Sequence, residues 1–289
     1  RVLYSTGAWA ESIELLETTI PQAEEVDPEL ALVARSILVG ILLFIPGTDR
    51  ASLKAHGIAV EYPGETPGER ALLAARAAQL MMDVEGDAET AAAIARRAWA
   101  DGLLLEDEGP GGITWSYATG ALAAADLYRE DEALLSRVLD AARRAGSSHA
   151  FASASYCRSC PLYFRGAIEE ALADAEAAAA AYDDGWELFY PLAMVVAARC
   201  RIELGDAPAA ARTLGLVPDE SKTLGTLMGL TWNLARCDLA LEAGDVAGAE
   251  RLLDRIRAEA GGHRSPFAFS DVLTTAAAVE RRKGRTEAA

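Results

Sequence analysis

The sequence is poor in the features that mark sheets, membrane spans and secreted proteins. Aromatic residues are only 7% of the chain, and the alternating runs of Val, Ile and Thr that predict strands do not occur. The longest apolar stretch runs from Ser36 to Ile45 and stops at Pro46, so it is too short to cross a bilayer. The chain has four cysteines and no secretory signal. We therefore expect reduced thiols in a cytoplasmic protein with no membrane contact.

The chain also lacks an excess of positive charge. Its 27 Lys and Arg residues face 44 Asp and Glu residues, which gives a formal net charge of −17. A chain this acidic repels phosphate backbones, so we expect this segment not to bind nucleic acid directly. Alanine, in contrast, is abundant, and it is the strongest helix former. The composition thus favours an all-α protein with ample apolar material for a core.

Glycines recur along the chain with a period close to 40 residues. The intervals between them are 40, 39, 80, 39, 39 and 40, for Gly7, Gly47, Gly86, Gly166, Gly205, Gly244 and Gly284. The double interval predicts a further turn without glycine near Arg129 and Glu130, which would make the fourth unit irregular. Because glycine accepts positive φ, each of these positions is expected to end a helix.

Three further sequence signals recur at nearly fixed distances from the turn glycines. A small residue follows each glycine by five positions, as Ser12, Ser52, Ala91, Ala171, Ala210, Ala249 and Ala289, and would let two helices approach closely. Asp87, Asp206 and Asp245 directly follow turn glycines and are expected to cap the next helix. Prolines 18 or 19 residues before a turn predict helix starts, at Pro28, Pro67 and Pro266.

These signals predict a single helical-repeat domain over residues 1–289. It would consist of about seven to eight antiparallel helical hairpins, each with a first helix, a tight turn and a second helix. The turns are expected near residues 7, 47, 86, 130, 166, 205, 244 and 284. Polar or Gly/Pro-rich loops between hairpins are expected at Glu61–Gly68, Glu106–Gly112, Asp183–Glu187, Val217–Lys222 and Gly261–Pro266. Both ends look cut, so we expect an excised piece of a longer protein.

The turn glycine with its small residue is similar to the tetratricopeptide repeat pattern, whose usual period is about 34 residues. The segment Glu130–Tyr182, with its "RAGS" and "IEEALADAEAA" stretches, resembles the sensor region of large ATP-binding regulators of the LuxR type, the maltose-regulator-like transcription activators. The resemblance implies a right-handed superhelical solenoid. It also implies a non-catalytic sensor that receives an effector or a protein partner and controls self-association. In that family a nucleotide-hydrolysing module precedes the repeats and a helix-turn-helix module follows them.

No set of residues has the spacing of a catalytic or metal site. The pair Cys157 and Cys160 forms a C-x-x-C without a βαβ context, and Cys160, Cys200 and Cys237 share one region of the hairpin, so packing explains them best. Gly109–Gly112 lacks the Lys and Ser/Thr of a phosphate loop. The acidic stretch Glu106–Glu108 is expected to be a solvated loop, and His56, His149 and His263 are isolated. We expect no enzyme activity, cofactor or metal.

The first helices are expected to line the concave face, where solenoids bind their partners. Seven residues on them are candidate binding anchors: Trp115, Tyr117, Tyr156, Arg158, Trp232, Asn233 and Arg236. In the alternative interpretation the aromatics fill gaps between hairpins and the arginines pair with carboxylates. The leading hypothesis is the sensor domain of a bacterial transcription regulator. The other two are a free-standing protein–protein adaptor of tetratricopeptide type and an all-helical enzyme, such as a toroid acting on sugars.

Overall fold

The computed structural model describes residues 9–44, 62–83, 86–217, 227–259 and 266–284. Every regular element within these ranges is a helix, as the composition predicts. The helices are α2 Trp9–Val26, α3 Pro28–Phe44, α5 Pro67–Met81, α6 Ala88–Trp99, α7 Leu103–Glu108, α8 Thr114–Ala124, α9 Tyr128–Ala145, α10 Ser148–Phe164, α11 Ile168–Ala179, α12 Tyr190–Glu203, α13 Ala207–Gly215, α15 Leu227–Glu242, α16 Val246–Glu259 and α17 Pro266–Arg282. Two short 3-10 turns, Ala100–Gly102 and Tyr182–Asp184, complete the described part.

The helix starts agree with the sequence signals. Pro28, Pro67 and Pro266 are the first residues of α3, α5 and α17, where a missing N–H costs nothing. The carboxylates of Asp87, Asp206 and Asp245 accept hydrogen bonds from backbone N–H groups in the first turns of α6, α13 and α16. Local chemistry therefore sets these boundaries, as predicted.

Four of the predicted turn glycines have the left-handed backbone that ends a helix. The φ angles of Gly166, Gly205, Gly244 and Gly284 are 83°, 77°, 77° and 78°. Gly86 allows a close approach of the backbone instead, because a Cβ atom there would lie 1.9 Å from the carbonyl oxygen of Leu80. Gly7 and Gly47 lie outside the described residues.

The turn expected near Arg129 and Glu130 lies elsewhere, because both residues are in the first turn of α9. The turn is centred on Asp126, whose φ is 59°. Aspartate tolerates this left-handed conformation better than most residues with a side chain, so it replaces glycine here. Asp126 follows Gly86 by 40 residues and precedes Gly166 by 40. The fourth unit is therefore regular, and the expected irregularity was wrong.

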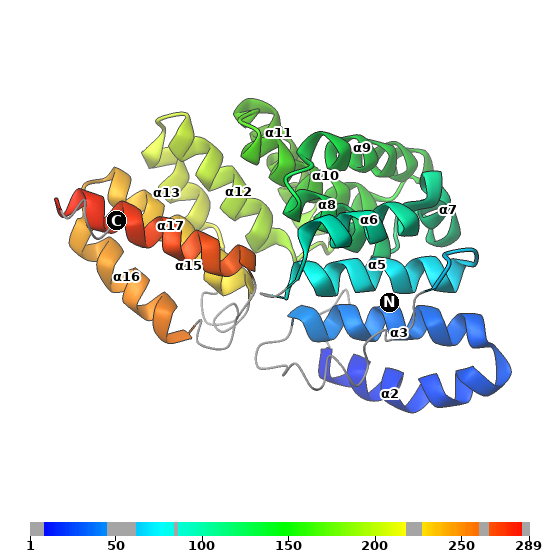
Figure 1. Cartoon of the computed structure of the whole chain (residues 1–289). Helices are drawn as coiled ribbons and strands as arrows, with labels where there is room; N and C mark the ends of the chain where they lie inside the picture. Colours follow the sequence, from blue (N-terminus) through cyan, green and yellow to red (C-terminus); the bar gives the residue numbers. More distant parts are fainter. Residues whose placement is uncertain (1–8, 45–61, 84–85, 218–226, 260–265, 285–289) are drawn as a thin grey trace.

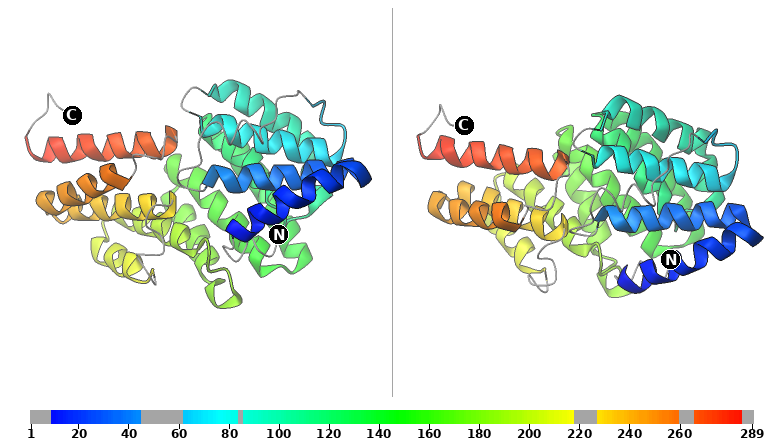
Figure 2. Two further views of the ribbon diagram at one scale, coloured as in Figure 1. Left: turned by 90° about the horizontal axis from the view of Figure 1, so that it is seen from below. Right: turned by 60° about the horizontal axis from the view of Figure 1, so that its bottom comes forward.

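We call the helix before each turn a first helix (α3, α5, α8, α10, α12, α15 and α17) and the helix after it a second helix (α2, α6, α9, α11, α13 and α16). Each first helix packs against the next one along the chain, from α3·α5 to α15·α17. The second helices pack against their own first helix or the following one. Figure 1 shows this sequential order, and in Figure 2 α2 and α17 lie on opposite sides of the molecule.

Small residues occupy the hairpin contacts as expected. Ala91, Ala171, Ala210 and Ala249 are all fully buried where a second helix approaches its neighbours. The equivalent residue after the Asp126 turn is Asp131, which is also buried although it is a carboxylic acid. Among the helices that the structure describes, none combines the length and the apolar content that a bilayer span requires.

Candidate ligand-binding cavity

A cavity of about 420 Å³ opens between the first helices. Its walls come from α3, α5, α8, α10, α12 and α15, and from the connecting segments 110–113 and 185–189. Ile37 of α3 and Met228 of α15 both line it, so helices from opposite parts of the chain meet around one space. Its volume falls within the range of about 300–1,000 Å³ that is usual for small-molecule sites.

The space exists because α8 and α10 present small side chains to it. Ser116 and Gly120 of α8 and Ser153 and Cys157 of α10 all line the cavity. A Cβ atom at Gly120 would lie 3.7 Å from the sulfur of Met81, at ordinary contact distance. A methyl group would therefore fit there, whereas a longer side chain would extend into the free volume.

The remaining walls are largely aromatic. The Trp186 ring packs near two other rings, with centroid distances of 6.4 Å to Tyr156 and 6.3 Å to Phe189. Its indole N–H donates to the Ser153 hydroxyl at 2.9 Å, and the indole N–H of Trp115 donates to the Pro110 carbonyl at 3.2 Å. Both indole N–H groups thus have a partner within the protein, and Trp115 and Trp186 are almost fully buried, at 1% and 3% exposure, where they support the cavity wall.

The acidic stretch before α8 holds Trp115 in place, and it is not the solvated loop expected from the sequence. Glu106–Glu108 belong to α7. The Glu108 carboxylate accepts from the Thr114 hydroxyl at 2.6 Å and from the Trp115 backbone N–H at 3.0 Å, so it caps α8. Asp107 pairs with the buried Arg70 at 2.7 Å. A Cβ atom at Gly112 would lie 2.0 Å from the Glu108 carboxyl carbon, which explains the glycine at this position.

Tyr117 of α8 lines the cavity, and its hydroxyl group lies against Gly40 of α3. A Cβ atom at Gly40 would lie only 1.7 Å from the Tyr117 hydroxyl oxygen. Gly40 therefore makes room for the tyrosine, and the α3–α8 contact depends on this missing side chain. Tyr117 itself is buried and lines the cavity together with Trp115 and Tyr156.

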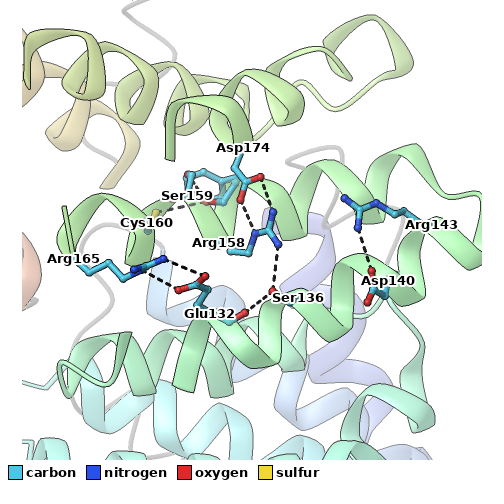
Figure 3. Close-up of polar contacts among 10 residues, drawn as sticks. Glu132, Ser136, Asp140, Arg143, Arg158, Ser159, Cys160, Arg165 and Asp174 are labelled. Carbon is cyan, nitrogen blue, oxygen red and sulfur yellow. Dashed lines mark hydrogen bonds and ion pairs between the residues drawn. The ribbon is translucent and has the colours of Figure 1, made fainter. Parts of the chain in front are cut away.

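Three of the seven candidate residues thus meet at one site, and the other four do not line it. Arg158 binds Asp174 through two contacts of 2.6 and 2.8 Å and donates to Ser136 at 3.2 Å (Figure 3). The Arg236 guanidinium lies 4.8 Å from the ring centroid of the buried Trp232. Asn233 donates to the Gly229 carbonyl at 2.7 Å. These residues contact α11, α9 and their own helix rather than the cavity.

The cysteines are free thiols, as expected. Cys200 and Cys237 are buried packing residues, whereas Cys160 is half-buried. Burial raises the pKa of the Cys157 thiol well above its usual range, so this thiol stays neutral where it lines the cavity. His56 and His263 lie outside the described residues. Within the described ranges, no group of three or more His, Cys, Asp or Glu side chains is placed to hold a metal ion.

Sequence reasoning missed several residues of the site. Trp186 and Phe189 follow a short 3-10 turn in a connection that the sequence marks only as a polar loop. A tryptophan in such a loop was the available signal, because a large aromatic residue rarely stays exposed. His149 and Glu187 also line the cavity from exposed positions.

No known protein family matches this sequence, and no curated protein shows significant similarity to it.

Proposed function

We propose that the chain is a tetratricopeptide-like, right-handed helical solenoid whose concave face binds a small lipophilic molecule. The 40-residue spacing of the turns and the contacts between successive first helices support the solenoid. In this proposal the first helices form the inner surface, because they contact one another in series and together surround the cavity.

The observation that carries the binding proposal is the aromatic cavity of about 420 Å³. An apolar cleft with a few polar groups at its edge is the common form of a ligand site. Here Trp115, Tyr156 and Trp186 form its walls, while Ser116 and Ser153 supply hydroxyl groups. A ligand that fills this space removes from water the apolar surface of half-buried lining residues such as Tyr156, Phe189 and Leu192, which is favourable.

We further propose that the chain belongs to a cytoplasmic transcription regulator of the LuxR type and that ligand binding regulates it. The resemblance of the segment Glu130–Tyr182 to the sensor region of such regulators supports this proposal. A ligand that joins α3, α8, α10, α12 and α15 would favour one curvature of the solenoid. This would change self-association or a contact with a protein partner. A coupling of about 1–3 kcal/mol between the two events is enough for regulation. The domain itself would carry out no reaction.

Nile red, a neutral lipophilic dye, tests the binding proposal. We expect one dye molecule to bind per chain, with blue-shifted emission and energy transfer from tryptophan. Gly120→Leu would fill the cavity and weaken dye binding by about tenfold or more, a loss of roughly 1.4 kcal/mol. Gly120→Ala adds only a methyl group at contact distance from Met81 and should bind as the wild type does.

Circular dichroism and thermal melts would confirm that both Gly120 variants are folded. The proposal fails if the folded wild type does not bind Nile red, or if Gly120→Leu binds it as well as Gly120→Ala does.

A further inference from the structure

The described residues that line the cavity include no Lys or Arg. Their one carboxylate is that of Glu187, and their one basic side chain is the imidazole of His149. Burial raises the pKa of Tyr156 well above its usual range, so this phenol remains neutral near pH 7. An anionic ligand would therefore lose its hydration without meeting a cationic partner, which is costly in an apolar site.

The ring faces at the cavity also favour positive charge. Aromatic rings carry negative electrostatic potential on their faces and attract cations within about 6 Å. Tyr156 and Phe189 are half-buried at the cavity and can present ring surface to a ligand, whereas Trp186, 3% exposed, packs near both of them. The same rings would also cover the hydrocarbon part of a ligand. One wall could therefore attract a positive charge and make apolar contacts.

Glu187 is held at the edge of the cavity by a defined turn. Gly185 has a φ of 90°, and its N–H donates to the Tyr182 carbonyl at 3.0 Å. The backbone N–H of Trp186 donates to the Ala181 carbonyl at 3.1 Å. A Cβ atom at Gly185 would lie 3.6 Å from the ring of His149, so this turn faces α10 across the edge of the cavity. Asp183 and Asp184, both exposed, precede the same turn and add negative charge near it.

The nearby arginines already have partners. Arg158 of α10 is paired with Asp174, and Arg143 lies over the ring of Phe151 at 5.2 Å. The chain as a whole has a net charge of −17, which raises the local concentration of cations around it. Local and global electrostatics therefore act in the same direction.

We propose that the ligand is a lipophilic cation, whose apolar part contacts the aromatic walls and whose positive charge lies near Glu187. This rests on the proposed function and adds the ligand's chemical class. It makes Glu187 a specificity-determining residue: a neutral molecule of the same shape would bind less tightly, and an anion least tightly.

Tetraphenylphosphonium and tetraphenylborate test the sign of the charge, because they have nearly the same shape and opposite charge. Each would displace Nile red from the full chain at pH 8, where an ordinary imidazole is neutral. We expect half-displacement by the phosphonium at a concentration about tenfold or more below that of the borate. Glu187→Gln, which keeps the shape of the side chain, should reduce this ratio at least about threefold. Glu169→Gln, at an exposed position of α11 outside the cavity, should leave it unchanged.

The outcomes separate the two proposals. If Nile red does not bind, the proposed function is wrong. If Nile red binds but the borate displaces it as well as the phosphonium does, or neither ion displaces it, the cation proposal is wrong and the lipophilic site stands. An unchanged ratio in Glu187→Gln would remove Glu187 from the role assigned to it.

Discussion

At the scale of single residues, Asp131 departs most clearly from the repeat. It occupies the position where the other described turns have a small residue, and the residue is only 2% exposed. No hydrogen bond reaches its Oδ1 atom. Burial, with the neighbouring charge of Glu132, raises the pKa of the Asp131 carboxyl to about 8. The folded chain therefore holds this carboxylic acid in its protonated form at neutral pH.

The consequence for stability follows from the sign of this shift. The folded state binds the proton more tightly than the unfolded state, whose carboxyl has an ordinary pKa of 3.8. The free energy of unfolding should then fall as pH rises from about 4 to about 8, and level off above that range. Asp131→Ala would remove this pH-dependent fall in the free energy of unfolding, because alanine has no carboxyl group to ionise. Alanine also fits the site, since it occupies the equivalent positions after the other described turns from Gly86 onward.

We expect Asp131→Ala to be more stable than the wild type at pH 8, by about 1–3 kcal/mol, with the difference decreasing toward pH 5. Urea unfolding at both pH values measures this. Asp140→Ala, at an exposed position of the same helix, is the control and should change stability little at either pH. Equal effects of Asp131→Ala at pH 5 and pH 8 would contradict the assignment.

At the scale of helices, the N-caps are the strongest link between sequence and structure. Asp206 accepts from the Ala209 N–H at 2.9 Å and begins α13, a helix of 9 residues. A helix this short is not stable alone, so its start and its packing must both contribute. Asp87 and Asp245 form the same kind of cap at the starts of α6 and α16.

Asp206→Ala should therefore lower the free energy of unfolding by about 1 kcal/mol. Asp206→Asn keeps an oxygen that can accept the same hydrogen bond and should cost much less. Chemical denaturation of the three proteins at one pH compares them directly. If alanine and asparagine destabilise equally, the hydrogen bond is not the reason for the aspartate.

At the scale of the whole molecule, the core is divided along the chain. The largest apolar cluster joins α3, α5, α6, α7, α8, α9 and α10 through residues such as Leu72, Trp115 and Leu139. Smaller clusters join α12 with α13 and α15, and α15 with α16 and α17. In the solenoid proposed above, stability would be roughly a sum of local terms, so we expect it to differ from one region to the next.

Hydrogen exchange should reveal this gradient. We expect amide protons of α8 and α10, inside or beside the largest cluster, to exchange more slowly than those of α2 and α16, which contact fewer of the described helices. Added Nile red should slow exchange further in α8, α10 and α12, the helices that line the cavity. Uniform exchange along the chain, with or without dye, would rule out this description.

Within the described residues, the local signals of the sequence predicted the all-helical fold and several of the helix starts and turns. Proline, aspartate and glycine act within a few residues of their own position, so Pro67, Asp206 and Gly244 mark boundaries that do not depend on distant packing. The Asp126 turn was misplaced because aspartate only sometimes adopts the left-handed conformation. With that turn misplaced, the unusual position of Asp131 also went unrecognised.

The cavity depends on the tertiary structure. Trp115, Tyr117 and Tyr156 could be chosen as aromatic residues of first helices, but the same reasoning also chose Trp232, which packs elsewhere. Whether such residues enclose a space depends on small side chains of neighbouring helices, such as Gly120, and on a loop from later in the chain. The repeat follows from chemistry between near neighbours in sequence, whereas the site follows from contacts between distant helices.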